Sequence, residues 1–203
     1  MPDYRKVKCV LLVFCLFIAC LSIAAQAQNP FDIRQFSATT VISGVPTQGR
    51  GGMGEMKIYR SADKMRTDMP GGMGYMIVDL SQHAAYMVMN GMCMQTATQT
   101  QSNPFAQASD ASIDRSPAGA DTLDGHPCKV ENLTITPHDG KPMKMKVWEA
   151  QDLKSFPIKV EMQTDKGTVT VLYKDLSFDA PPASLFTHPE NCRQMPSGMT
   201  GPR

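Results

Sequence analysis

The feature of this sequence that most restricts its fold is a series of short runs in which apolar and polar residues alternate. Four such runs follow one another at residues 56–60, 64–68, 75–79 and 85–89, separated by Gly, Asp and Asn. Alternation with a period of two, interrupted by turn residues every eight to twelve positions or so, is typical of antiparallel strands joined by hairpins. We therefore expect a meander of strands in this part of the chain.

The meander also repeats its own opening. The segment GGMGEM at residues 51–56 returns as GGMGYM at residues 71–76, and each copy leads into an alternating run. Glycine weakens a strand and often marks a bend. We interpret the repeat as two glycine-rich entries into strands of one curved sheet.

Further alternating runs occupy residues 36–43, 129–135, 143–149, 157–163 and 168–178. Together with the meander they predict roughly nine strands, with one short helical turn near residues 181–186. A parallel α/β design would need longer helices between its strands. The predicted class is mainly β: a curved antiparallel sheet that forms an open half-barrel with one or two short helices or loop lids.

One long segment interrupts this pattern. Residues 95–121 are rich in Gln, Ser, Thr, Ala, Asn and Pro, and we predict a polar loop or lid there. The domain prediction is a single β half-barrel at residues 28–195 that contains this loop, followed by a flexible tail at residues 196–203.

The first 27 residues have the pattern of a secretory signal peptide. Basic residues precede an apolar run, and Ala25-Gln26-Ala27 provides a cleavage site, so we expect cleavage before Gln28 and a periplasmic or secreted protein. A lipoprotein acylated at Cys20 is the alternative. The apolar run is shorter than the ~20 residues that a transmembrane helix needs, so no transmembrane anchor is predicted.

Charge argues against nucleic acid as a partner. The leader carries three basic residues and one acidic residue, so its removal changes the formal net charge from +1 to −1. Phosphate binding needs clustered Lys and Arg, which the rest of the sequence lacks. Nothing in the sequence indicates an oligomeric state.

Export makes the three cysteines beyond the leader, Cys93, Cys128 and Cys192, candidates for one disulfide. A bridge from the C-terminal tail to the sheet would hold an end that is otherwise loose. We therefore favour Cys128–Cys192, with Cys93–Cys128 as the next choice.

Methionine is the unusual residue of this chain, with 16 copies. Its flexible side chain fills irregular apolar space and suits ligands of variable shape. Alternation predicts that one face of the sheet is lined by a set of seven residues: Met65, Met76, Val78, Tyr86, Val88, Val147 and Ile158. A Cu(I) site at Met92, Cys93 and Met94 is an alternative, since soft sulfur ligands select Cu(I).

The sequence offers no catalytic residues and no cofactor motif. It lacks a nucleophile elbow, a phosphate-binding loop and a dinucleotide-binding glycine pattern. Its four histidines lie beside turn residues without the spacing of a metal site. We expect a protein that is not an enzyme.

Several short motifs resemble a known family. They include Lys64-Met65-Arg66, Ile77-Val78-Asp79, Val147-Trp148-Glu149 and Phe156-Pro157-Ile158-Lys159-Val160. Over residues 35–195 the chain resembles a group of exported bacterial domains similar to the periplasmic lipoprotein-carrier superfamily (LolA, LolB and RseB). The resemblance implies a half-barrel whose concave apolar face, covered by lids, accepts acyl chains.

The chain also departs from that family. It has no amphipathic helix before the first strand, its candidate lid is polar, and no equivalent of the carriers' buried arginine is recognisable. We therefore expect an exported domain that binds a hydrophobic ligand, either a lipid or a lipidated protein, on the concave face. The alternatives are the Cu(I)-binding protein and a structural or interaction domain with a filled core.

Overall fold

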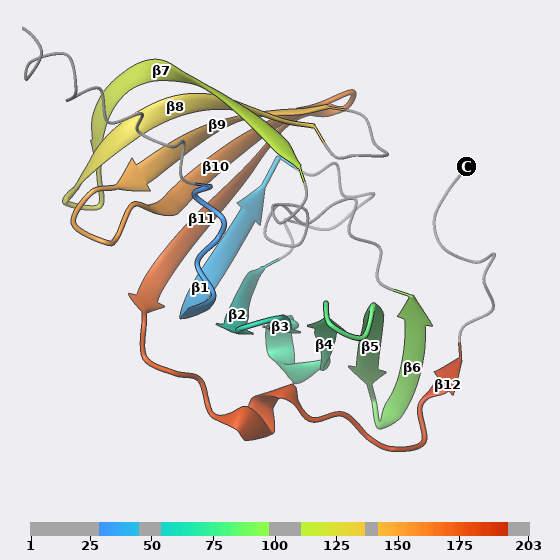
Figure 1. Cartoon of the computed structure of the whole chain (residues 1–203). Coiled ribbons are helices and arrows are strands. Elements are labelled where there is room, and N and C mark those ends of the chain that lie inside the picture. Colours follow the sequence, from blue (N-terminus) through green and yellow to red (C-terminus); the bar gives the residue numbers. More distant parts are fainter. Residues whose placement is uncertain (1–28, 45–53, 98–110, 137–141, 195–203) are drawn as a thin grey trace, which may run out of the picture.

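The strands of this protein form a single open sheet (Figure 1). The computed structural model describes residues 29–44, 54–97, 111–136 and 142–194. The strands are β1 (Gln35–Ser43), β2 (Glu55–Ser61), β3 (Lys64–Asp68), β4 (Gly74–Asp79), β5 (Ala84–Met89), β6 (Met92–Ala97), β7 (Ser112–Leu123), β8 (His126–Thr136), β9 (Met143–Ala150), β10 (Phe156–Thr164), β11 (Gly167–Ser177) and β12 (Arg193–Gln194). Two 3-10 helices, η2 (Pro70–Gly72) and η4 (Ala183–Phe186), complete the described elements. The predicted mainly β class is confirmed.

The order of the strands is β12-β6-β5-β4-β3-β2-β1-β11-β10-β9-β8-β7. Most neighbours are hairpins, and the first strand joins the two halves by pairing with both β2 and β11. All pairings are antiparallel except the short one between β12 and β6, which is parallel. Strands β7 and β12 lie at the ends, so the sheet does not close.

The predicted meander corresponds to β2–β5, and the later alternating runs correspond to β8–β11. The described part of the chain has twelve strands rather than about nine. The predicted loop at residues 95–121 was wrong at both ends, because β6 extends to Ala97 and Ser112–Leu123 is a full strand. Residues 98–110 lie outside the described residues, as do the predicted leader and the tail at residues 196–203.

The strand β7 escaped prediction because it lies at the edge of the sheet. Most of its side chains are exposed, so no apolar alternation marks it. Pro117 and Gly119 interrupt it, and the pairing with β8 shifts register between them. Proline and bulges are common on edge strands, where an unpaired N–H is not needed.

The sheet curves over one of its faces, which we call the inner face; the opposite face is the outer face. Pairing places Met65 opposite Val78 and Val147 opposite Val160, so their side chains share the inner face. All four belong to one buried cluster, although β3 and β9 are far apart in the strand order. Figure 1 shows the corresponding arch of β7–β11 and its continuation through β1 into β2–β6.

Two segments outside the sheet cover parts of it. The N-terminal segment 29–34 lies against the inner face, where Phe31 is fully buried in the main cluster. The C-terminal segment 178–194 crosses the outer side of β3–β6 through η4 and reaches β12 beside β6 (Figure 1). We call this second segment the strap.

Candidate functional site

The inner face is the candidate site because the apolar side chains of both halves of the sheet meet there. Met65, Val147 and Ile158 are at most 4% exposed. Ile158 lies where the pairing of β10 with β9 shifts register, and it packs into the same cluster. Five of the seven predicted lining residues therefore belong to this cluster: Met65, Met76, Val78, Val147 and Ile158.

The other two predicted lining residues, Tyr86 and Val88, were placed on the wrong face. Asp79 pairs with Ala84 across a four-residue loop, so Val78 lies opposite Ala85 and Tyr86 lies opposite Ile77. The even-numbered residues of β4 thus share a face with the odd-numbered residues of β5. Tyr86 and Val88 form a second buried cluster under the strap, on the outer face.

Part of the inner face is only half-buried. Met76, Met162, Val171 and Tyr173 share this face by their pairing and pack against the main cluster, yet none of them is fully covered. They lie on β4, β10 and β11, so apolar surface is accessible on both halves of the sheet. Burial raises the pKa of the Tyr173 hydroxyl.

The disulfide joins Cys93 to Cys192, with a Cα–Cα distance of 4.5 Å. Both predicted pairings, Cys128–Cys192 and Cys93–Cys128, were therefore wrong. Cys128 lies on β8 opposite Ala150 and is a buried free thiol. The strap does tie the tail to the sheet, but it does so at β6.

The same disulfide contradicts the predicted copper set of Met92, Cys93 and Met94. Cys93 has no free thiolate, and its side chain lies on the outer face with Val88 as its cross-strand partner. Alternation puts Met92 and Met94 on the inner face. The three sulfur atoms therefore cannot converge on one ion.

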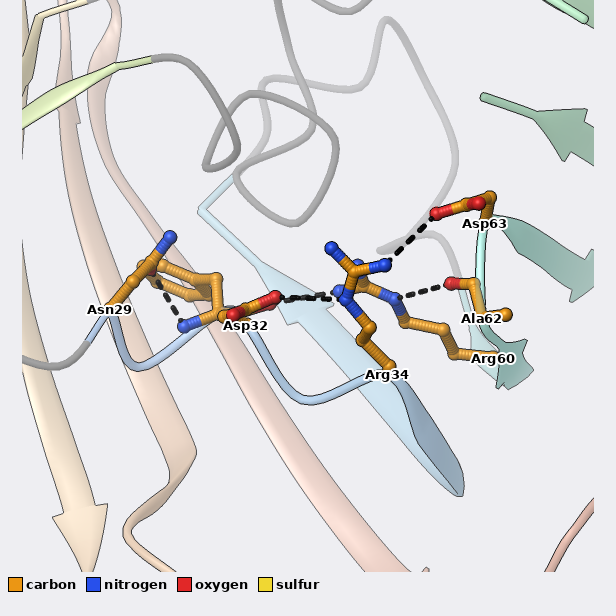
Figure 2. Close-up of polar contacts among 7 residues, drawn as sticks. Asn29, Asp32, Arg34, Arg60, Ala62 and Asp63 are labelled. Atoms are coloured by element: carbon orange, nitrogen blue, oxygen red, sulfur yellow. Dashed lines mark hydrogen bonds and ion pairs between the residues drawn. The ribbon is translucent and has the colours of Figure 1, made fainter. Parts of the chain in front are cut away.

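A buried arginine links the N-terminal segment to the inner face. Arg60 is 4% exposed, and its Nη1 donates a hydrogen bond of 2.8 Å to the carbonyl oxygen of Phe31. Burial lowers its pKa, while the nearby carboxylate of Asp32 acts in the opposite direction. Figure 2 shows that Arg34 lies beside it and reaches Asp32 and Asp63 from an exposed position.

A second buried charge cluster lies on β7–β9. Arg115 forms ion pairs with both Glu131 and Glu149, and Lys129 Nζ lies 2.5 Å from Glu131 Oε1. Burial raises the pKa of Glu149 despite Arg115. Burial acts the same way on Glu131, but hydrogen bonds from Lys129 and Arg115 outweigh it and hold its pKa below the usual range.

Sequence reasoning missed these charged residues, although a signal was present. Arg60 is in phase with Ile58, and Glu131 is in phase with Leu133 and Ile135. A charged residue that falls on the apolar face of a strand must be paired or hydrogen-bonded there. The alternation of Arg60 and Glu131 with apolar residues could therefore have predicted that both are buried.

The outer face holds a pocket of about 240 Å³ at the edge of the strap. Its lining is mostly polar and consists of Lys64, Ile77, Asp79, Gln82, Tyr86, Phe186, Thr187 and His188. The rings of Tyr86 and His188 stack with centroids 3.6 Å apart. Asp79 accepts hydrogen bonds from Ser81 and Gln82 there, so its carboxylate has partners.

Within the described ranges, no group of three or more His, Cys, Asp or Glu side chains has the arrangement of a metal site. The same residues contain no helix that is long and apolar enough to cross a membrane.

Comparison with known proteins identifies a family and several similar folds. Residues 45–177 match the family model described as "Domain of unknown function (DUF4412)". No curated protein matches the chain in sequence.

Similar solved structures include the lipoprotein LppX of Mycobacterium tuberculosis, with 10% identity, a TM-score of 0.46, and coverage of 74% of this chain and 90% of that chain. A LolA superfamily protein of Nitrosomonas europaea has 12% identity, a TM-score of 0.43, and coverage of 79% and 94%. A putative outer membrane lipoprotein-sorting protein domain of Vibrio parahaemolyticus has 11% identity, a TM-score of 0.42, and coverage of 75% and 88%.

Proposed function

The chain belongs to the DUF4412 family, and we propose that it binds the hydrocarbon part of a hydrophobic ligand, a lipid or a lipidated protein, on the inner face of its sheet. The observation that carries the proposal is the half-buried apolar surface that continues the main cluster on both halves of the sheet. Met76, Met162, Val171 and Tyr173 form this surface. A domain whose core served stability alone would gain by covering these side chains.

The chemistry of the surface suits an acyl chain. Thioether side chains adapt to ligands of different shape because they are unbranched and have three rotatable bonds. Burial of hydrocarbon contributes about 25 cal/mol per Å², from which the loss of ligand freedom must be subtracted. Binding of this kind needs no catalytic group, and we propose no enzymatic activity.

The buried charges support a binding role because they neutralise one another. Arg115 is shared by Glu131 and Glu149, and these carboxylates are 4% and 6% exposed. Buried charges that are paired in this way hold strands together or fix their geometry. We assign them to the geometry of the inner face rather than to chemistry on a ligand.

The disulfide supports an exported location. Disulfides form and persist in the periplasm and outside the cell and are rare in the cytosol. The bond between Cys93 and Cys192 therefore agrees with the leader predicted at residues 1–27. Cleavage before Gln28 and acylation at Cys20 remain the two alternatives for how the exported chain begins.

A fluorescent fatty acid tests the proposal. Dansyl-aminoundecanoic acid should gain emission on binding, and unlabelled phospholipid or a triacylated lipopeptide should displace it. Met76→Lys places a charge on the half-buried surface and should abolish the gain. Met73→Lys is the matched control, because Met73 is 53% exposed and should tolerate the change.

The two competitors distinguish a free lipid from a lipidated protein. No emission gain with the folded wild-type protein, or equal loss in both lysine variants, would contradict binding on the inner face. The first of these results would favour the alternative of a structural domain with a filled core.

A further inference from the structure

The hairpin of β5 and β6 carries four methionines around a two-residue turn. The sequence from Met87 to Met94 has methionine at its first, third, sixth and eighth positions, with Asn90 and Gly91 at the turn. Asn90 and Gly91 have φ values of 49° and 77°, as a type I′ hairpin turn requires. Because this turn fixes the register, Met89 pairs with Met92 and Met87 pairs with Met94.

All four side chains therefore lie on one face, the inner face. Residues opposite each other on antiparallel strands have Cβ atoms about 5 Å apart, and residues two positions apart along a strand lie about 7 Å apart. A methionine side chain is long enough for its sulfur atom to reach the middle of such a rectangle. We call Met87, Met89, Met92 and Met94 the methionine patch.

Apolar packing alone does not explain this distribution. Met92 is 64% exposed, and the other three members of the patch are only half-buried. The packed outer face of the same hairpin, all of which the structure describes, contains Tyr86, Val88 and Cys93 but no methionine. Within this hairpin, methionine is thus absent from the packed face and concentrated on the face where sulfur is accessible.

From this arrangement we propose that the methionine patch binds a soft monovalent metal ion of the Cu(I) class through thioether sulfur alone. Thioethers select Cu(I), whereas oxygen ligands suit Mg²⁺ and Ca²⁺. The sulfur atom of Cys93 takes no part, since it is bonded to Cys192 on the other face. The proposal is independent of acyl-chain binding, although Met76, the cross-strand partner of Met87, borders both surfaces.

The surroundings of the patch are compatible with a singly charged ion. Four thioethers are neutral, so a bound Cu(I) ion would leave one positive charge on an accessible surface. The charged neighbour across the strands is Arg193 of β12, which pairs with Met94 and is exposed.

The test is an anaerobic titration with Cu(I) in competition with bicinchoninate, without thiol reductants so that the disulfide remains intact. The wild type should bind one Cu(I) per chain through the patch. Changing all four patch residues to Leu keeps the apolar volume but removes sulfur, and should weaken binding more than about tenfold. This variant should still bind the fluorescent fatty acid, which separates the two proposals.

Three further variants keep the test decisive. Met92→Leu alters a side chain that is 64% exposed, so the fold should tolerate it, and it should weaken Cu(I) binding measurably even if the quadruple variant does not fold. Cys128→Ser and Met73→Leu should leave binding unchanged. Unaltered affinity in Met92→Leu and in a folded quadruple variant, or loss of binding in Cys128→Ser, would overturn the proposal.

Discussion

Arg60 donates a hydrogen bond of 2.8 Å from its Nη1 to the carbonyl oxygen of Phe31, and both residues are buried on the inner face. The bond holds segment 29–34 against β2, because its two residues are 29 positions apart in the chain. It is one of the hydrogen bonds that partner this buried positive charge, together with the one from Arg60 Nε to the carbonyl oxygen of Ala62.

Replacing Arg60 by Met should therefore lower the free energy of unfolding by about 1–3 kcal/mol, because the buried hydrogen bond to the carbonyl oxygen of Phe31 is lost. Arg34→Met is the control. The ion pairs of Arg34 with Asp32 and Asp63 are exposed, and such pairs contribute about 1 kcal/mol at most. Urea denaturation of both variants measures the difference. Equal losses in the free energy of unfolding would show that the buried hydrogen bond of Arg60 contributes no more to stability than the exposed ion pairs of Arg34.

The disulfide should hold the strap on the outer face. Changing Cys93 and Cys192 to Ala should lower the free energy of unfolding by about 2–5 kcal/mol, because the bond closes a long loop. A proteolytic map without reductant should contain a peptide pair linked through these two cysteines. A linked peptide that contains Cys128 instead would contradict the attachment of the strap to β6 through Cys93 and Cys192.

The pH dependence of stability should reveal Glu149. Its pKa is raised by burial, so the folded protein holds this proton more tightly than the unfolded chain does. The contribution of this group to stability is present below its ordinary pKa of 4.5 and is lost as the pH rises through the raised value. Glu149→Gln should therefore be more stable than the wild type near neutral pH, and the gap should narrow toward pH 4.5.

Glu131 is the internal control for that experiment, because its pKa is lowered. Its contribution is present above the ordinary value and is lost as the pH falls through the lowered one. Glu131→Gln should therefore be less stable than the wild type near neutral pH. If both variants change the free energy of unfolding in the same direction at neutral pH, the opposite pKa shifts assigned to Glu131 and Glu149 are wrong.

The repeated glycine motif contains positions of different importance. A Cβ atom at Gly74 would lie 2.1 Å from the carbonyl oxygen of Val88 on the neighbouring strand, whereas one at Gly71 would have no atom within 4 Å. Gly74→Ala should lower stability by more than about 2 kcal/mol. Gly71→Ala should cost only about 1 kcal/mol, from its positive φ. Comparable melting temperatures for the two variants would contradict the close approach at Gly74.

Alternation predicted the fold well wherever one face of a strand is buried and the other is exposed. It located β2–β5 and β8–β11, but it missed β7, whose two faces are both exposed over most of its length. It also found the inner-face positions of Met65 and Val147. It could not place Tyr86 and Val88, since the relation between β4 and β5 depends on the length of the loop between them.

The pairing of the cysteines could not be predicted from the sequence, for a different reason. The partner of Cys192 depends on where the strap runs, and the strap has no alternation that could reveal its path. Only the pairing of Arg193 with Met94 brings Cys192 next to Cys93. Where an irregular segment such as the strap docks depends on the surface that the folded sheet presents. A local sequence pattern cannot predict it.

Native mass spectrometry of the protein purified from the envelope of its own host tests binding on the inner face most directly. We predict an adduct with the mass of a lipid, which Met76→Lys loses and Met73→Lys keeps. A mass that corresponds to the bare polypeptide in all three preparations would contradict the proposed function, even if the protein is correctly folded and disulfide-bonded.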